Sequence, residues 1–501
     1  MELTFKSSPL RFLRCVMQEV HFQEETSDTI VPDSYPDIAY IAACHADVIL
    51  RGKDCRDHHV TVAGGIKGSI LYVPEGDTQP KSMDVYIPFT MKFDHMELSE
   101  QSQIICSMRI RSVDARMVNS RKATLRVGIG CELTAYENAV EELYEFAGTE
   151  TNIQTKYNQY RVNLPLETGE KSFVIQDTID FSGHPTVEQI CKFRCELLQA
   201  DQRIVGNKII FKGSLVCKVL YLTTDHKLHV LQHIFPYSQY CEVSQEYDDE
   251  LVQIEPVITG YDIETNQALE PDRAEIHVHV LAQCLITGNK ELLLLNDAYA
   301  MNGDLDLKWK EYGFSLCLDH QCTTQTIRKQ LNGEGQNVID TDVYWDYPIV
   351  KRSHETVQIS QPVTFHVLTS ENDQLQNRVE RAETTQELAL AGHCICHAET
   401  LPTGELYALL TGDGMEVRCG VQICTDCYTE NKLRAICGGE IIHENTKELE
   451  KSTIIVRKVP VNTVLWDLAK AYRTTEKEIM EANNLDSDRI AAETMLLLPV
   501  L

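Results

Sequence analysis

The sequence predicts a multidomain protein of mainly β or α+β class, with three tandem β-rich units and a small C-terminal domain ordered strand–helix–helix–strand. Three observations carry this prediction. Short segments recur 149 residues apart, apolar residues alternate with a period of two in each copy, and two amphipathic helix patterns lie near the C-terminus. A chain of 501 residues also exceeds the size at which a single core stops growing, roughly 250–300 residues.

Domain boundaries follow from the repeat spacing and from changes in composition. We place unit 1 at 1–148, unit 2 at 149–300 and a diverged unit 3 at 301–441, with a linker at 442–452 before the C-terminal domain at 453–501. The linker is polar and has no apolar periodicity. Units with a core of roughly 100 residues are too long for solenoid repeats, so we expect three beads and not a continuous stack. Whether the beads pack on one another or hang apart stays open.

Units 1 and 2 share one register. Gly64 recurs as Gly213, and Leu71-Tyr72 recurs as Leu220-Tyr221, each 149 residues later. A strand with a proline before an aromatic residue follows in both units, at Pro88-Phe89 and Pro236-Tyr237. Each unit then ends in an alternation typical of a strand with one buried face. The alternating residues are Leu125, Val127, Ile129, Cys131 and Leu133 in unit 1, and Ile276, Val278, Val280 and Ala282 in unit 2.

Unit 3 keeps the pattern and loses part of the signature. The segment Thr364–Thr369 takes the place of the Leu-Tyr strand, and the terminal alternation falls on Val417, Cys419, Val421 and Ile423. The middle strand has lost its proline. Many strands separated by turn signals favour antiparallel sandwiches or related α+β modules for all three units.

The C-terminal domain shows strand and helix signals in a fixed order. A β-type stretch over Thr453–Val459 precedes helix patterns over Val464–Tyr472 and Thr475–Ala482, and an apolar strand at Met495–Pro499 closes the chain. One apolar stripe runs along the first helix at positions i, i+3, i+4 and i+7, on Leu465, Leu468, Ala469 and Tyr472. Thr463 and Thr475 stand where helix N-caps belong, and Thr475 with Glu478 has the form of a capping box.

This order closely resembles a LysM domain, the fold that recognises N-acetylglucosamine chains of cell walls. The motifs that carry the resemblance are Leu465-Trp-x-Leu-Ala469, Ala482-Asn-Asn-Leu485 and a final Leu-Leu-Pro499. The resemblance implies a shallow binding groove between the loop after the first strand and the loop after the second helix. Mapped by motif, the groove residues are Asn462, Thr463, Val464, Leu465, Asn483, Asn484, Leu485, Ile490 and Ala491.

The groove admits two interpretations: it holds peptidoglycan, or it has been turned to a protein partner. The usual loops read Gly-Asp-Thr-Leu and Pro-Gly-Gln, whereas this chain has Asn462-Thr-Val-Leu465 and Ala492-Glu-Thr494. Glycines matter there because they permit positive φ and let backbone amides approach a sugar. The bulkier side chains favour the protein partner. Trp466 is more easily explained as a core residue of the helix than as a platform for sugar stacking.

The repeats also resemble a known family. The entry motif Val31-Pro-Asp-Ser-Tyr-Pro-Asp-Ile38 and the segment Asn119-Ser-Arg-Lys122 are similar to the SPOCS domain, found in spore-coat proteins of endospore-forming bacteria. SPOCS units followed by a terminal LysM are the arrangement of SipL-like coat morphogenetic proteins. The resemblance implies a scaffold that binds the coat-base ATPase and other coat proteins at the forespore surface, within the mother-cell cytoplasm. The alternative is a LysM-mediated protein that binds the peptidoglycan glycan.

Charge and hydropathy exclude several classes of partner. The net charge is −29, and nearly all of it falls on residues 1–452. An acidic surface repels phosphates, which argues against nucleic acid as a partner. No apolar block is long enough for a membrane span, and Met1–Lys6 does not resemble a secretion signal, so we expect a cytoplasmic protein. Its 18 cysteines are then expected to be mostly reduced and buried.

No motif for chemistry is present. The phosphate-binding loops, His-Glu-x-x-His and Gly-x-Ser-x-Gly are all absent, so we predict no catalytic residue, no cofactor and no enzyme. One cluster of possible zinc ligands falls on His393, Cys394, Cys396, His397, Cys419, Cys424, Cys427 and Cys437. Cys394 and Cys396 have the same-face spacing of a strand, and Cys419 continues a buried alternation. We therefore predict structural thiols and no metal.

Overall fold

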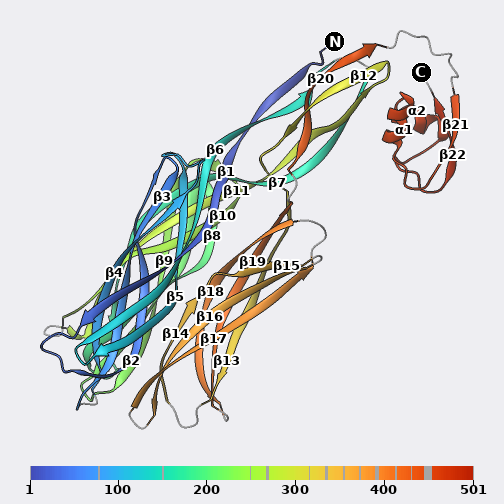
Figure 1. Cartoon of the computed structure of the whole chain (residues 1–501). Helices are drawn as coiled ribbons and strands as arrows, with labels where there is room; N and C mark the ends of the chain where they lie inside the picture. Colours follow the sequence, from blue (N-terminus) through green and yellow to red (C-terminus); the bar gives the residue numbers. More distant parts are fainter. Residues whose placement is uncertain are drawn as a thin grey trace.

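The computed structural model describes residues 2–76, 79–148, 152–248, 250–266, 270–314, 316–332, 337–353, 356–371, 374–389, 394–411, 414–429, 432–444 and 454–499. Antiparallel strands make up nearly all of this chain, and the two short helices lie near the C-terminus (Figure 1). The predicted mainly β, multidomain class is confirmed. Among these residues, no helix is both long and apolar enough to cross a membrane.

Two three-stranded antiparallel sheets build unit 1. One has the order β1 (Phe5–Ile30), β6 (Lys122–Phe146), β5 (Gln103–Asn119). The other has the order β2 (Ile38–Arg56), β3 (His59–Pro74), β4 (Lys81–Asp94). The alternating residues of β6 that the sequence singled out are all buried between the sheets. The period of two therefore reports the core, as expected.

Unit 2 repeats the two-sheet arrangement, with three strands in its first sheet and two in its second. Its first sheet has the order β7 (Ile153–Asp180), β11 (Glu270–Ala300), β10 (Leu251–Asn266). The last strand of the unit, β11, lies in the centre, as β6 does in unit 1. Its second sheet pairs β8 (Val187–Thr223) with β9 (Leu228–Tyr247). The four alternating residues of β11 are again buried. The shared register predicted from the 149-residue spacing thus corresponds to a shared strand order.

Unit 3 has the same plan with an interruption. β13 (Cys317–Leu331), β19 (Gly414–Thr429) and β18 (Cys394–Thr411) form one sheet. The other holds β16 (Thr356–Glu371), β17 (Gln374–Ala389), and a first strand divided into β14 (Asn337–Trp345) and β15 (Ile349–Arg352). The division falls at Pro348, which cannot donate a ladder hydrogen bond.

The repeated glycine has a packing reason. Gly64 lies directly across from Phe89, and a Cβ built on it would lie 2.2 Å from the Phe89 ring. Gly213 and Tyr237 form the same cross-strand pair in unit 2, where a Cβ would lie 2.4 Å from the Tyr237 hydroxyl. In unit 3 the matching pair is Gln361 and Thr384, so unit 3 has neither the glycine nor the aromatic ring at this place. The glycine therefore leaves the space that the aromatic ring opposite it fills.

Each unit contains two packed sheets, and one strand pair of the unit extends beyond them. The three strand pairs form a shared extension, which we call the stalk (Figure 1). It comprises Phe5–Cys15 with Tyr136–Phe146, Ile153–Asn163 with Asn289–Ala300, and β12 (Gly303–Glu311) with β20 (Arg434–Glu444). The three ribbons bury apolar side chains against one another, including Phe12, Val162, Leu294, Tyr312 and Leu433.

The three units also meet at a common axis near their bodies. Leu71, Leu220 and Leu368 pack in one cluster, and they occupy the same place in each repeat, 149 and 148 residues apart. The sequence left open whether the units pack on one another or hang apart, and the structure shows them closed around one another. Sequence periodicity could not show this, because the contacts join residues far apart in the chain.

Named strands pair only within the predicted units in the part of the chain that the structure describes. The exact unit boundaries stay predictions. β20 ends at Glu444, so the first residues assigned to the linker are strand. The remainder of the linker, 445–452, lies outside the described residues.

Candidate functional site

The predicted groove lies in the C-terminal domain, which packs β21 (Ile454–Val459) and β22 (Thr494–Pro499) against α1 (Leu465–Tyr472) and α2 (Glu476–Asn483). Leu465, Leu468 and Ala469 of the predicted stripe are buried, as is Ile479 of α2. The predicted capping box is present: Thr475 Oγ1 accepts from the Glu478 N–H at 3.1 Å, and the Glu478 carboxylate accepts from the Thr475 N–H at 3.1 Å.

Thr463 does not cap α1. The N-cap residue is Val464, and the Thr463 hydroxyl instead donates to the Pro460 carbonyl at 2.9 Å. The hydroxyl thus closes the turn before the helix. The expectation of a Thr463 cap was wrong by one residue, because the turn competes for the same side chain.

The structure brings the first loop and the last loop together. The Asn462 N–H donates to the Ile490 carbonyl at 2.8 Å, and the Ile490 N–H donates to the Thr463 carbonyl at 3.0 Å. The Leu465 N–H donates to the Asp488 carbonyl at 2.8 Å. Asn462 also has a φ of 66°, so it adopts the conformation that a glycine usually provides. Backbone groups of these loops are therefore bonded to each other.

Asn483, Asn484 and Leu485 end α2 on the side of β22. The Asn483 amide donates to the carbonyls of Ile479 at 2.8 Å and Leu497 at 2.6 Å, and its oxygen accepts from the Leu497 N–H at 2.7 Å. Asn484 is the C-cap in the left-handed region, at φ 52°. These residues fix the loop in place. Their predicted role, and that of all nine groove residues, in binding a ligand or partner stays a prediction.

An open depression beside α2 was not foreseen from the sequence. It is lined by Glu476, Lys477, Met480, Glu481, Asn484, Leu485 and Asp486. It shares Asn484 and Leu485 with the predicted groove, and its charged lining residues are three acids and one lysine. The available sequence signal was the amphipathic pattern of α2, which placed Met480 beside charged residues without showing that they line a hollow.

The face of α1 is held against the stalk. The Trp466 indole N–H donates to Asp297 Oδ2 at 2.8 Å, and the Lys470 ammonium pairs with Asp297 Oδ1 at 2.6 Å. The Tyr299 ring meets the Trp466 ring edge to face at 5.0 Å, and the Tyr299 hydroxyl donates to the Thr474 carbonyl at 2.6 Å. Figure 1 shows the helices turned towards the stalk and the β21–β22 ribbon on the far side.

This contact explains Trp466. Its side chain is only 5% exposed, and part of that burial comes from Tyr299 of unit 2. Burial alone would raise the pKa of the Asp297 carboxyl, but the Lys470 ammonium and the Trp466 N–H hold it below its usual value. The prediction that Trp466 is a core residue is confirmed, and the core around it also includes Tyr299 of the stalk.

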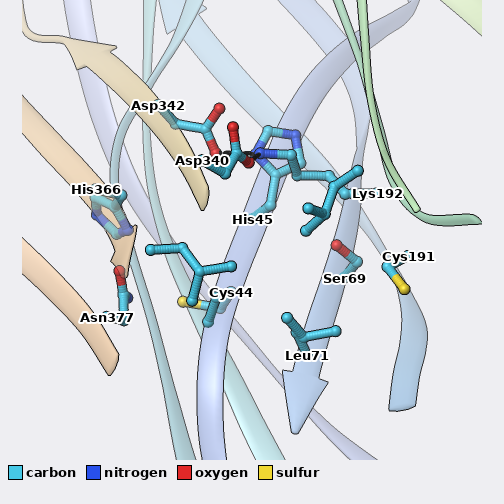
Figure 2. Close-up of a pocket in the computed structure, with 13 residues that line it drawn as sticks. Cys44, His45, Ser69, Leu71, Cys191, Lys192, Asp340, Asp342, His366 and Asn377 are labelled. Atoms are coloured by element: carbon cyan, nitrogen blue, oxygen red, sulfur yellow. Dashed lines mark hydrogen bonds and ion pairs between the residues drawn. The ribbon is translucent and has the colours of Figure 1, made fainter. Parts of the chain in front are cut away.

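Figure 2 shows a second cluster of polar side chains, where the three units meet. Lys192 of unit 2 forms ion pairs with Asp340 and Asp342 of unit 3, the second at 2.6 Å. Lys218 also pairs with Asp340, and Arg194 with Asp342 at 3.2 Å. We call these five residues, together with His45, the axial cluster. Unit 2 supplies the cations and unit 3 the anions.

The axial cluster follows the repeat register. His45, Arg194 and Asp342 are 149 and 148 residues apart, so they are the same position in three units. His45 Nδ1 lies 2.9 Å from the Tyr344 hydroxyl and 3.6 Å from Asp342 Oδ2. No sequence motif marked these residues, because their charges become complementary only when different units meet.

The ion pairs of the axial cluster keep its side chains ionised although they are buried. Burial alone would raise the pKa of both carboxyls, but Lys192 holds the pKa of Asp340 below its usual value and that of Asp342 well below it. The same two carboxylates raise the pKa of Lys192, against the effect of burial.

A small cavity of about 20 Å³ borders this cluster, a volume that fits a water molecule. His366 of β16 lines it, is 4% exposed, and has both ring nitrogens without a hydrogen-bond partner. Burial lowers the pKa of His366 to about 4, so its ring is neutral. The cavity is too small for a substrate, and the cluster around it serves to join the units.

The cysteines and histidines of unit 3 that the structure describes make contacts of other kinds. Cys424 is bonded to Cys322 in a disulfide, which the sequence did not predict. The Cys396 and Cys427 sulfurs lie 2.8 Å apart, and Cys419 is buried in β19. His393 lies outside the described residues. Within the part of the chain that the structure describes, no group of three or more His, Cys, Asp or Glu side chains is placed to hold a metal ion.

Comparison with protein families gives two matches. Residues 186–266, within unit 2, match "SipL, SPOCS domain", and residues 464–499 match "LysM domain". No curated protein and no solved structure matches the chain. Both families are non-catalytic domains, and together they fit a sporulation-related or peptidoglycan-binding protein. The chain thus carries one segment similar to the SPOCS domain of SipL and one similar to a LysM domain.

Proposed function

We propose that this protein is a non-enzymatic spore-coat morphogenetic scaffold. It binds the coat-base ATPase, contacts other coat proteins, and helps to localise and attach the coat around the forespore from the mother-cell cytoplasm. The joint presence of a SPOCS and a LysM match on one chain supports this role. The closed packing of the three units supports it further, because a scaffold with fixed surfaces raises the effective concentration of its partners.

The observation that carries the protein-partner reading is the hydrogen bonding between the two groove loops. The N–H groups of Asn462 and Leu465 are already donated to the second loop, so they are not available to a sugar. Glu493 stands where the family loop usually has a glycine and pairs with Lys458 at 2.9 Å. Loops that are hydrogen-bonded to each other beside the depression of α2 suit a polypeptide better than a glycan chain.

Binding assays with matched surface variants test this proposal. Ala491→Arg places a large side chain in the predicted groove, and Glu481→Arg reverses a charge in the α2 depression; both positions are exposed. Each is expected to weaken binding to the coat-base ATPase about tenfold, the effect of losing one good contact. Ala482→Arg is the control, because Ala482 is exposed on α2 but lies outside both surfaces.

Recruitment in sporulating cells gives a second test. A chain ending at Lys451 lacks the LysM domain and is expected to lose its place at the forespore. Normal localisation of that chain would assign recruitment to the repeats instead.

The second candidate function is peptidoglycan binding, which the LysM match favours. In the same assays it predicts sedimentation with purified peptidoglycan and loss of that sedimentation in Ala491→Arg. Retention on the glycan with no affinity for the ATPase would reverse our choice.

A further inference from the structure

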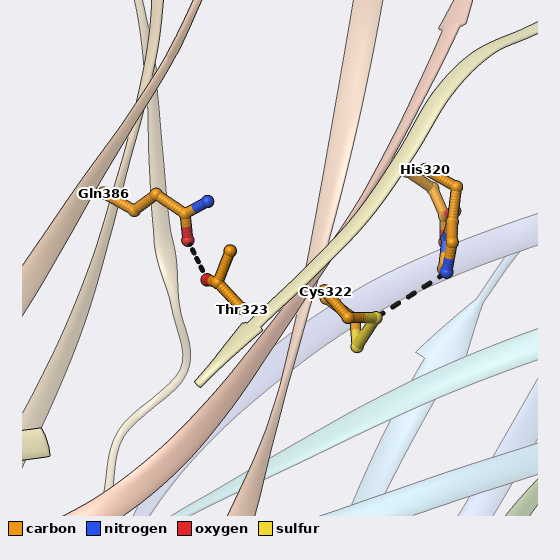
Figure 3. The surroundings of a disulfide bond; sticks show 6 residues. His320, Cys322, Thr323 and Gln386 are labelled. Atoms are coloured by element: carbon orange, nitrogen blue, oxygen red, sulfur yellow. Dashed lines mark hydrogen bonds and ion pairs between the residues drawn. A yellow bond between two sulfur atoms is a disulfide. The ribbon is translucent and has the colours of Figure 1, made fainter. Parts of the chain in front are cut away.

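The disulfide of unit 3 lies at the surface beside a histidine and an aspartate. Figure 3 shows Cys322 of this disulfide next to His320. Cys322 of β13 is exposed, and Cys424 of β19 lies directly opposite it in the ladder. The next pair along the same face is His320 and Asp426, whose Nδ1 and Oδ1 atoms lie 2.6 Å apart. The other ring nitrogen of His320 lies 3.6 Å from the Cys322 sulfur.

Strand alternation turns this group away from the interior. Thr323, the next residue of β13, points to the other side, where its hydroxyl donates to Gln386 of β17 at 2.6 Å (Figure 3). Cys322 and His320 are two residues apart and so share the opposite face. The carboxylate, imidazole and sulfur therefore lie in line on an accessible surface.

Most of the free cysteines that the structure describes, eleven of them, are buried, which makes their thiols less reactive. Burial raises the pKa of the Cys44 thiol to about 12 and that of Cys106 to about 11, which disfavours the reactive thiolate. The Cys322 sulfur is in the opposite environment, because it is exposed and lies next to the His320 imidazole.

We propose that Cys322 and Cys424 form a thiol–disulfide exchange site, in which Cys322 is the attacking sulfur and His320, oriented by Asp426, handles its proton. The substrate class is an unhindered disulfide, and in the reverse direction an accessible thiol. The geometry of the four residues carries this assignment, independently of the coat role.

The exchange balances without any further reagent. In the dithiol form, His320 takes the Cys322 proton, and the thiolate attacks one sulfur of R–S–S–R. A Cys322–S–R bond forms, and the leaving R–S⁻ takes the proton from His320. Cys424, after giving its proton to solvent, attacks the Cys322 sulfur and expels the second R–S⁻, which is protonated by solvent. The substrate disulfide gains two electrons, and the two cysteines lose two.

The fold supplies a matched control histidine. His397 of β18 also lies across from Asp426 in the ladder, on the other side of β19. The contacts of its ring go to Gln18 and Glu132, not to the disulfide. Two histidines thus flank one carboxylate, and one of them touches the sulfur.

The experiment follows glutathione disulfide reacting with the reduced full-length chain, with mass spectrometry to locate each new bond. We expect the Cys322–Cys424 bond to re-form, and glutathione to stay on Cys322 in Cys424→Ser. His320→Ala should slow both reactions about tenfold at neutral pH and move the midpoint of the rate against pH upward. His397→Ala should leave both unchanged.

Three results would overturn the proposal. One is a Cys322 that reacts no faster than the exposed Cys15, which lies in the stalk. Another is an equal effect of His320→Ala and His397→Ala on the rate. The third is glutathione attached to a different cysteine in Cys424→Ser. None of these bears on ATPase binding, so the two proposals fail separately.

Discussion

The three repeats contact one another in two places, the axial cluster and the stalk. Ion pairs characterise the first contact, and apolar packing characterises the second. In the axial cluster the units are joined by buried charges, with Lys192 and Arg194 of unit 2 facing Asp342 of unit 3. In the stalk they are joined by apolar side chains such as Phe12 and Leu294. One contact is directional, because a cation needs an anion. The other depends on area and shape alone.

The difference indicates a division of labour. Apolar ribbons can pack in more than one arrangement, whereas the carboxylates of the axial cluster find their cations only when unit 2 faces unit 3. Buried polar groups can fix the register of an assembly in this way at some cost in stability. We therefore expect the stalk to supply stability by burial, and the axial cluster to specify which unit lies beside which.

The largest expected effect comes from breaking the axial cluster. Asp342→Asn keeps the shape of the side chain, at a site 7% exposed, and removes the carboxylate that pairs with both Lys192 and Arg194. Lys192 keeps its pair with Asp340, and Arg194 keeps only a longer contact, 3.9 Å, to Asp47 of unit 1. The free energy of unfolding should fall by about 4 kcal/mol, as when one partner of a buried pair is removed. Urea unfolding measures this loss. Asp114→Asn, in an exposed pair with Arg116, is the control and should cost under about 0.5 kcal/mol.

A cavity in the stalk comes next. Leu294 is fully buried among the ribbons, so Leu294→Ala should lower the free energy of unfolding by about 3 kcal/mol. Its neighbour Leu293 is 61% exposed, and Leu293→Ala should have almost no effect. Equal losses in the two variants, measured by urea unfolding, would contradict the apolar role of the stalk.

Low pH should lower the free energy of unfolding through a buried histidine beside the axial cluster. The pKa of His366 is lowered from 6.5 to about 4 by burial, so its contribution to stability is complete above pH 6.5 and is lost as pH falls towards 4. Between pH 7 and pH 5 this loss is about 2 kcal/mol. His366→Phe keeps a ring against Tyr344, 4.9 Å away, and cannot be protonated. The wild type should therefore lose about 2 kcal/mol more than this variant over that interval, and equal losses would sink the prediction.

The smallest effect is expected where the C-terminal domain touches the stalk. Arg473 pairs with Asp304 of β12 at 2.7 Å, and both side chains are partly exposed. Arg473→Ala should weaken this docking by about 0.5 kcal/mol, and salt should diminish the difference because surface pairs are screened. Protease sensitivity of the region before Ile454 reports the docking. Lys477→Ala, in an exposed pair within α2, should leave it unchanged.

Sequence reasoning reached further in the C-terminal domain than in the repeats. The capping box at Thr475 and the stripe through Leu468 depend on residues within four positions of one another, and both are present. The alternation through Val127 and Val278 likewise marked buried faces correctly. The α2 depression escaped notice, because a hollow depends on how neighbouring elements pack.

The sequence by itself determined the strands, the common register of the units and the two helices, because periodicity, turns and caps act between near neighbours. Only the tertiary structure decided that the units close around an axis, that Lys192 faces Asp342, and that Trp466 is buried against Tyr299. Each of these contacts joins residues about 150 positions apart or more. Their charges and rings are ordinary in the sequence and gain their meaning only where folding brings them together.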